Sequence, residues 1–207
     1  MSKNKGFTLI ELIIVIALIA ILATTVILVI NPVKIFQEAR DSQRIADLGQ
    51  MNSALSLYAS TASTVALGTT GTCYAYVASN ANMSNASTSL NLSGKCQGRY
   101  SATVTTMTTS SSQTASSSSA WVPVNLSGVS GGSPLAAWPV DPKVTFDTAA
   151  SSTSYFYSYT PDTTNSTWEL DANMESDRYK SGGTDDVEGT DGGDKSMVLE
   201  VGTSTTL

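Results

Sequence analysis

The chain opens with a long apolar segment and then becomes mainly polar. Residues Leu12 to Ile30 carry no charge, and Thr24 and Thr25 are the only polar side chains in this run. As an α-helix, the stretch from Phe7 to Ile30 would be about 36 Å long, which is enough to cross a bilayer. We therefore predict a transmembrane helix over 7–30.

A cleaved secretory signal peptide is an alternative interpretation of this segment. Lys3 and Lys5 would form its basic n-region. However, the apolar run is too long for an h-region, and no Ala-x-Ala-like cleavage site closes it. The two lysines instead favour a cytoplasmic N-terminus, which places the rest of the chain outside the cytoplasm. We predict a single-pass protein of the cytoplasmic membrane.

A helical pattern continues after Asn31-Pro32-Val33. Apolar residues recur three and four positions apart, which marks one face of a helix. They are Ile35, Phe36, Ala39, Ile45, Leu48, Met51, Leu55 and Tyr58. The charged residues, Arg44 and Asp47 among them, are expected on the other faces. Because Pro32 lacks a backbone donor, we predict a kink there. The whole helix over 7–60 would be about 81 Å long, so its second half must pack on something outside the membrane.

Composition and charge exclude several classes of function. The 207 residues include 11 Lys+Arg and 17 Asp+Glu, for a net charge of −6, and no histidine. Such an acidic chain lacks the excess of basic residues that binds the phosphate backbone of nucleic acid. Without histidine the usual Ser-His and Cys-His catalytic pairs are impossible, so the Gly-x-Ser-x-Gly pattern at 128–132 is interpreted as a glycine-rich turn. No carboxylate pair is spaced recognisably for catalysis. We predict that the protein is not an enzyme.

Glu11 follows Phe7-Thr8-Leu9-Ile10 and directly precedes the uncharged run. A carboxylate inside a transmembrane helix costs about 2.5–3.5 kcal/mol, so it needs either a partner or a position at the headgroup boundary. Both interpretations are open from burial alone. Cleavage between Gly6 and Phe7 would create a partner, the new α-amino group of Phe7. Pairing between subunits would then set the register of packed helices.

The string Lys5-Gly6-Phe7-Thr8-Leu9-Ile10-Glu11-Leu12, followed by the uncharged run, closely resembles the class III signal of type IV pilins and type II secretion pseudopilins. In that family a prepilin peptidase cuts after the glycine and N-methylates the new first residue. The resemblance implies that Gly6 ends a leader over 1–6. It also implies that Phe7 becomes the methylated N-terminus and that Glu11 guides assembly.

The resemblance further implies the partners and the location of the protein. Members of this superfamily form a helical homopolymer, and they interact with the prepilin peptidase, an inner-membrane assembly platform, minor pilins and membrane lipid. We expect a bacterial protein whose extracytoplasmic head enters a pilus or pseudopilus after assembly. We expect no nucleic acid as a partner of the subunit fold itself.

The segment over 61–207 is predicted to form the exported head. Clusters of aromatic and β-branched residues between Gly, Pro and Asp are typical of antiparallel strands. They lie at 121–124, 155–159, 168–170 and 197–201. A long helix packed on a small antiparallel sheet is an α+β fold. The chain contains 31 Ser and 27 Thr, and a Ser/Thr-rich insertion at about 101–120 is predicted to be a solvated surface loop.

Two cysteines, Cys73 and Cys96, fall in the exported segment. An even number of cysteines in an oxidising compartment favours a disulfide. Closing a loop of about 24 residues would stabilise the head by about 3 kcal/mol. Two free structural thiols are the alternative. The spacing is far from the Cys-x-x-Cys of redox proteins.

The C-terminal part adds to the resemblance from Pro134 onward. The residues that look like the C-terminal part of major pseudopilins are Trp138-Pro139-Val140-Asp141-Pro142, Tyr157-x-Tyr159, Trp168 to Ser176, Asp191-Gly192-Gly193-Asp194 and Glu200-Val201-Gly202. Residues 61–133 match no pattern of that family. They depart from the compact major pseudopilin.

Eleven of the 17 acidic residues lie at or after Asp162, and the densest group alternates with glycines between Asp185 and Asp194. Carboxylates on a flexible loop suit Ca²⁺, although the spacing is not that of an EF-hand. Major pseudopilins bind calcium in a C-terminal acidic loop, so the resemblance favours calcium here, and we select Asp186, Asp191 and Asp194 as the expected ligands. A solvated acidic loop without metal is the alternative.

A filament subunit is the leading functional hypothesis, in the form of a type II secretion major pseudopilin-like protein serving protein export. The C-terminal pattern favours that form. The Ser/Thr-rich insertion is more typical of a surface type IV pilin for adhesion, motility or DNA uptake. A non-polymerising, single-pass anchored binding protein would explain the apolar run and the head. It would not explain the Gly6-Phe7 junction, Glu11 or the amphipathic continuation.

Overall fold

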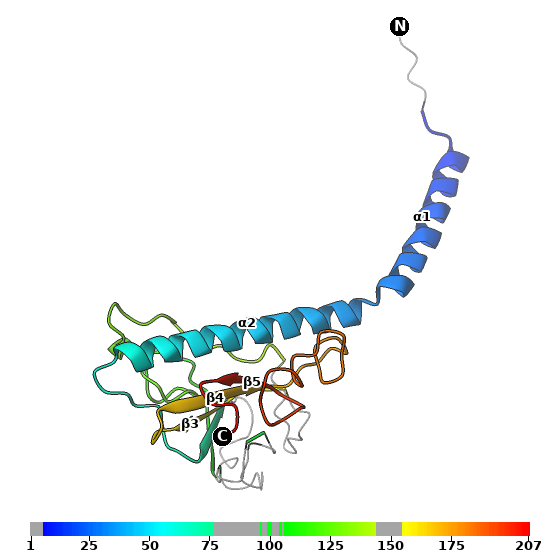
Figure 1. The fold of residues 1–207 in the computed structure, drawn as a ribbon. Coiled ribbons are helices and arrows are strands. Elements are labelled where there is room, and N and C mark those ends of the chain that lie inside the picture. The colour runs from blue at the N-terminus through cyan, green and yellow to red at the C-terminus, as the bar shows by residue number, and fades with distance from the viewer. Residues whose placement is uncertain (1–5, 77–95, 97–98, 101–103, 105, 144–154) are drawn as a thin grey trace. The chain divides into compact units, whose positions relative to one another are not determined.

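The chain divides into two compact units, Met1–Gln37 and Glu38–Leu207, in the computed structural model (Figure 1). The residues that the structure describes are 6–76, 96, 99–100, 104, 106–143 and 155–207. The boundary between the units falls inside the segment over 7–60 that was predicted as one long helix.

This segment consists of two helices rather than one kinked helix. Helix α1 spans Leu9–Ile30 and ends at Asn31, whose backbone is left-handed with a φ of 43°. Asparagine tolerates this conformation better than most residues. Helix α2, Pro32–Thr61, begins immediately afterwards. Proline suits the first position of a helix because its missing N–H is not needed there. The interruption is therefore made by Asn31, and Pro32 begins a new helix.

From Glu38 onward, α2 packs in the head through one helical face. Its buried residues are Asp41, Arg44, Leu48, Met51, Ala54, Leu55 and Tyr58. The predicted apolar face is thus confirmed from Leu48 to Tyr58. Nearer the start of α2, where Ile35 and Phe36 are 51% and 64% exposed, packing of the apolar face on something outside the membrane stays a prediction.

The described residues of the head form a five-stranded sheet with the order β2-β1-β3-β4-β5. The strands are β1 (Thr72–Tyr76), β2 (Thr106–Ser110), β3 (Ser158–Asp162), β4 (Thr167–Ala172) and β5 (Leu199–Gly202). All neighbours pair antiparallel except β1 and β2, which are parallel. The α+β fold is confirmed, whereas the sheet predicted as antiparallel is mixed. The long connection over 77–105 gives the chain the length that a parallel pairing requires.

The two faces of the sheet differ in chemistry. On β4, Trp168 and Leu170 belong to the main apolar core together with Leu48 and Met51 of α2. Trp168 also donates from Nε1 to Asn52 of α2 at 2.9 Å. Because side chains alternate along a strand, the residues between these apolar ones point away from α2. A second, smaller core of Cys73, Cys96, Tyr100 and Val104 is separate from the main one.

The Ser/Thr-rich insertion is not a wholly solvated loop. Strand β2 lies inside it at the sheet edge, and Thr106 and Thr72 join the two strands through hydroxyl groups 2.8 Å apart. Ala115 and Ala120 are buried in the main core. The prediction failed here because threonine is a good strand former even within a tract of loop-like composition. Residues 101–103 and 105 lie outside the described part.

The cluster at 121–124 is buried as core but does not form the predicted strand. A short 3-10 helix, η3 (Leu126–Gly128), follows it. The Gly-x-Ser-x-Gly pattern at 128–132 begins at the last residue of η3 and continues through the bend and turn that follow it.

Candidate functional site

The Gly6-Phe7 junction lies outside any helix. Both residues are exposed without regular secondary structure, and Phe7 is 87% exposed. Thr8 follows in an extended conformation, and α1 starts only at Leu9. Exposed, irregular backbone of this kind is where proteases cut most readily. The peptide bond predicted to be cleaved is therefore accessible before the helix begins.

Thr8 and Glu11 form the N-terminal cap of α1. The hydroxyl of Thr8 accepts a hydrogen bond from the backbone N–H of Glu11 at 3.3 Å. A carboxylate in the first turn is favoured by the unpaired N–H groups of the helix start. Because the cap uses the amide of Glu11, its exposed carboxylate stays available for another charge.

Beyond Glu11, the surface of α1 is apolar on every side as far as Ile27, apart from Thr24 and Thr25. Among the described residues, Leu9–Ile27 is the one stretch of helix that is long and apolar enough to cross a membrane, and none of it is buried. Thr24 and Thr25 donate their hydroxyls to the backbone oxygens of Ala20 and Leu22, both at 2.8 Å. Neither threonine therefore brings an unsatisfied donor into an apolar environment. Such a helix requires lipid or other apolar helices around it.

In the head, α2 is fixed by a buried ion pair that the sequence did not predict. Arg44 is fully buried and donates from Nε and Nη2 to the carboxylate of Asp141 at 2.7 and 2.8 Å. It also donates from Nη1 to Asp41 at 2.7 Å. Burial opposes the charge of Arg44, yet the bonds to Asp141 and Asp41 raise the pKa of its guanidinium. The sequence did contain a signal that Arg44 is buried, because Asp41, Arg44 and Leu48 share one face of the helix.

A second carboxylate extends this network to the C-terminal part of the head. Glu175 accepts hydrogen bonds from Arg40 at 2.7 and 2.8 Å and from Lys143 at 2.6 Å. Although burial opposes ionisation, these bonds lower the pKa of Glu175 to about 2. Asp41 accepts the backbone N–H groups of Glu175 and Ser176 at 2.8 and 2.7 Å. Helix α2 and the segment after β4 are therefore joined in both directions. Glu175 accepts from Arg40 of α2, and Asp41 of α2 accepts from the backbone of Glu175 and Ser176.

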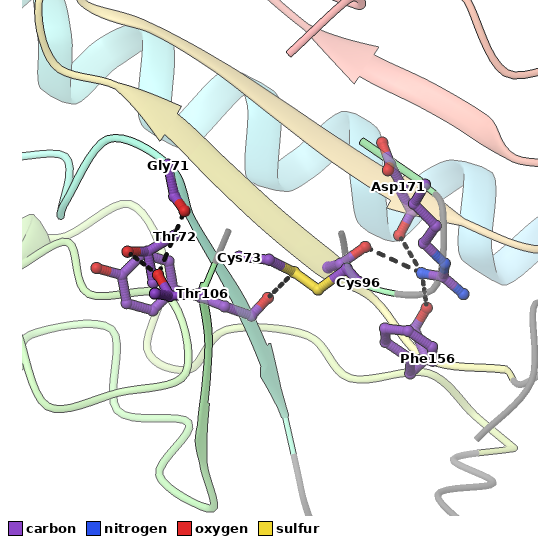
Figure 2. Close-up of a disulfide and its surroundings, with 10 residues drawn as sticks. Gly71, Thr72, Cys73, Cys96, Thr106, Phe156 and Asp171 are labelled. Atoms are coloured by element: carbon purple, nitrogen blue, oxygen red, sulfur yellow. Dashed lines mark hydrogen bonds between the residues drawn. A yellow bond between two sulfur atoms is a disulfide. The ribbon is translucent and has the colours of Figure 1, made fainter. Parts of the chain in front are cut away.

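Cys73 of β1 and Cys96 form the predicted disulfide (Figure 2). Both residues are buried, and their Cα atoms are 6.1 Å apart. Three residues later, Arg99 donates to the backbone oxygens of Phe156 at 2.8 Å and Asp171 at 3.4 Å. The disulfide therefore attaches the segment that carries Arg99 to the sheet.

The residues predicted to bind calcium lie in the loop between β4 and β5. Asp186 accepts the backbone N–H groups of Gly182 and Gly189 at 2.8 and 2.7 Å. Asp191 accepts the backbone N–H groups of Gly193 and Glu200 at 3.0 and 2.6 Å, and Asp194 pairs with Lys195. Within the described residues no three acidic, cysteine or histidine side chains converge into a group that could hold a metal ion. Calcium binding at this loop stays a prediction.

If the loop binds calcium, adding calcium to the full-length protein in detergent should raise the unfolding temperature of the head. A ligand that binds only the folded state stabilises it by about 2.7 kcal/mol at a hundred times its Kd. The change Asp191→Asn should abolish this shift. Asp162→Asn, an aspartate outside the loop, should retain it. An unfolding temperature that does not respond to calcium would contradict the prediction.

Comparison with known families concerns the N-terminal segment. Residues 1–27 match the family model for the prokaryotic N-terminal methylation motif, a range that includes Gly6, Phe7, Glu11 and most of α1. Searches of curated proteins and of solved structures give no significant match. The match implies processing by a prepilin peptidase and filament assembly, and with α1 it fits a single-pass membrane anchor. It supports a structural subunit of the pilin or pseudopilin kind in the broad sense, rather than an enzyme.

Proposed function

We propose that this protein is a structural subunit of a type IV pilus-like filament, and specifically a major pseudopilin-like subunit of a type II secretion system serving protein export. One observation carries the proposal. The methylation motif coincides with an exposed Gly6-Phe7 junction and with a helix that is long and apolar enough to cross a membrane. A plain membrane anchor needs the apolar helix but has no use for the motif.

The first proposed step is hydrolysis of the Gly6–Phe7 peptide bond by a prepilin peptidase. Water adds across the bond, so Gly6 leaves with a carboxylate and Phe7 gains a free α-amino group. The peptidase then transfers a methyl group from a methyl donor to this nitrogen, which loses one proton. The product is still a basic amine, so the mature chain begins with a cation four residues before Glu11.

The second proposed step is pairing between subunits. Phe7 lies only four residues before Glu11, at the start of α1, so Glu11 of one subunit meets the Phe7 amine of a neighbour when two α1 helices pack with a small axial offset. An unpaired carboxylate in an apolar environment costs about 2.5–3.5 kcal/mol. Only registers that pair the two charges avoid this cost. The pair therefore selects one register among many that the apolar surface alone would allow.

The same apolar surface serves the subunit twice under this proposal. Before assembly the side chains of α1 contact lipid, and after assembly they contact the α1 helices of other subunits. Both environments are apolar, so extraction from the membrane costs little once neighbouring helices are present. The head stays outside and is carried by the filament.

A surface type IV pilin for adhesion, motility or DNA uptake is the second candidate. The observation that favours it is the Ser/Thr-rich insertion, whose described part places β2 at the sheet edge. The resemblance of 134–207 to major pseudopilins favours the secretion role. Cells that lack the chain should fail to secrete their type II cargo if the first assignment is right, and should lose surface pili if the second is.

We expect the membrane-extracted protein to begin at N-methylated Phe7, and we expect Glu11→Ala to be processed normally but to assemble poorly. Intact mass spectrometry measures the processing, and the yield of sheared filaments measures assembly. Glu38→Ala, which removes a carboxylate beyond the membrane-spanning helix, is the matched control and should assemble normally. A chain that still begins at Met1 in cells with an active prepilin peptidase would overturn the filament proposal. Normal filament yield from Glu11→Ala would overturn the pairing step alone.

A further inference from the structure

Two acidic side chains lie inside the head on the sheet face that points away from α2. Glu169 and Asp171 are two residues apart on β4, so they project to the same side of the sheet. Both are fully buried, with 0% of their surface exposed. Their neighbour Leu170 points into the main apolar core. Two acids therefore occupy a strand face that is completely covered.

The carboxyl oxygens of this pair lack donors among the described residues, with one exception. Glu169 Oε2 accepts the backbone N–H of Leu207 at 2.7 Å. Glu169 Oε1 and both carboxyl oxygens of Asp171 have no hydrogen-bond partner in the described part of the chain. The carboxyl of Asp171 interacts electrostatically with that of Glu169, and the carboxyl of Glu169 interacts in the same way with that of Glu200. Ionised carboxylates only accept, so a carboxyl of this group can donate a hydrogen bond only when it carries a proton.

The surrounding charges do not neutralise the pair. Glu200 of β5 lies directly opposite Asp171 in the β4–β5 ladder and is 3% exposed, so it adds a third buried carboxyl. Arg99 is the cation that interacts electrostatically with the carboxyl of Asp171. Its guanidinium also donates a hydrogen bond to the backbone oxygen of Asp171. The groups that face the pair are Arg99 and Tyr100 before β2, Ser158 and Thr160 on β3, Glu200 on β5, and Asp191, Asp194 and Lys195 in the β4–β5 loop. The ammonium of Lys195 is already paired with Asp194.

The protonated form of the pair is therefore favoured in the folded head. Burial, followed by repulsion from Glu169, raises the pKa of Asp171 well above its ordinary value, and Arg99 only partly opposes this. Burial, with repulsion from Glu200, raises the pKa of Glu169 to about 8 despite the bond from Leu207. In an unfolded chain both groups titrate near pH 4.

We infer that Glu169 and Asp171 form a proton-holding pair that makes the attachment of β5 and the C-terminal residues to β4 sensitive to pH. With a proton bound, the two side chains carry less charge. Without it, the anions repel each other and repel Glu200 across the ladder. The pair contributes its full stabilisation at pH values below the pKa that the two acids have in the unfolded chain. This stabilisation is lost as the pH rises through the pKa that they have in the folded head. The inference concerns the exported head and does not depend on filament assembly.

Hydrogen exchange of the full-length protein in detergent, followed by mass spectrometry between about pH 5 and pH 8.5, tests the inference. After correction for the intrinsic exchange rate, we expect the protection of 199–207 to fall with rising pH, by up to tenfold per pH unit for each proton lost. Protection of α2 beyond Glu38 should change less. In Glu169→Gln and Asp171→Asn, which keep the shape of the protonated acid, the fall should be abolished or reduced. Asp177, whose side chain is 74% exposed, provides the control, and Asp177→Asn should show the same pH dependence as the wild type.

The pH dependence of hydrogen exchange in the wild type tests the inference even if a variant does not fold. Constant protection of 199–207 over the whole pH range would overturn the inference. A fall that is unchanged in both Glu169→Gln and Asp171→Asn would assign the effect to other groups and would also overturn it. Repeating the series with calcium separates a metal effect, because a pH dependence that appears only in the presence of calcium would contradict a proton-holding pair.

Discussion

Replacing Arg44 by methionine is expected to destabilise the head by about 3–5 kcal/mol, the usual cost of removing one partner from a buried ion pair. Methionine retains much of the side-chain volume, so the loss would come from charge. Asp41 and Asp141, which both contact the guanidinium at 2.7 Å, would be left buried without their cation. Because Asp41 also holds the backbone of Glu175 and Ser176, the disturbance should spread to the segment after β4.

Urea unfolding of the full-length protein in detergent, followed by tryptophan fluorescence, measures this loss, since Trp138 and Trp168 are buried in the main core. Arg178→Met is the matched control. Arg178 contacts Glu38 at 3.3 Å and Asp185 at 2.6 Å, but its side chain is 46% exposed. Exposed pairs contribute about 1 kcal/mol or less. Similar losses from Arg44→Met and Arg178→Met would contradict the buried-pair argument.

A compensating variant separates unpaired charge from lost packing. Adding Asp41→Asn and Asp141→Asn to Arg44→Met removes the two uncompensated anions. Part of the lost stability should then return, because neutral amides are far less costly to bury than carboxylates. No recovery would mean that the shape of the arginine, rather than its charge, holds α2 in place.

The N-terminal segment up to the end of α1 was well predicted because its signals are local. A run without charges is long enough to be a membrane helix whatever follows it, and the Gly6-Phe7 junction with Glu11 is a contiguous motif that the family comparison matched. The interruption at Asn31 was not predicted, because proline within a helical pattern indicates a kink as readily as an end. Only the left-handed backbone of Asn31 decides between the two.

The interior of the head was predicted less well because its decisive contacts are distant in sequence. Periodicity assigned Arg44 to a face other than the apolar one, yet Arg44 is buried with Asp141, which lies 97 residues away in the sequence. Likewise, Glu169 and Asp171 look like the outward positions of a half-exposed strand. They are buried because residues from before β2 cover that face of the sheet, among them Arg99 and Tyr100. Alternation along a strand identifies its two faces but not which of them is solvated.

Removing the disulfide is the second change for which we expect a large loss. Cys73 and Cys96 are 23 residues apart, so their bond should stabilise the head by about 3 kcal/mol by restricting the unfolded chain. We expect the variant Cys73→Ser/Cys96→Ser to lose that amount in urea unfolding. Dithiothreitol should cause a similar loss in the wild type and none in the variant. A variant as stable as the oxidised wild type would contradict this expectation.

The disulfide should also affect the charges on the covered sheet face. Cys96 lies three residues before Arg99, and Arg99 is the cation that partly opposes the rise in the pKa of Asp171. Without the bond, the segment carrying Arg99 is held to β1 less firmly. The protection of 199–207 against hydrogen exchange should then fall more steeply with pH in the double-serine variant than in the wild type. An equal pH dependence in both proteins would mean that contacts other than the disulfide, such as the bonds to Phe156 and Ser158, are sufficient to hold Arg99.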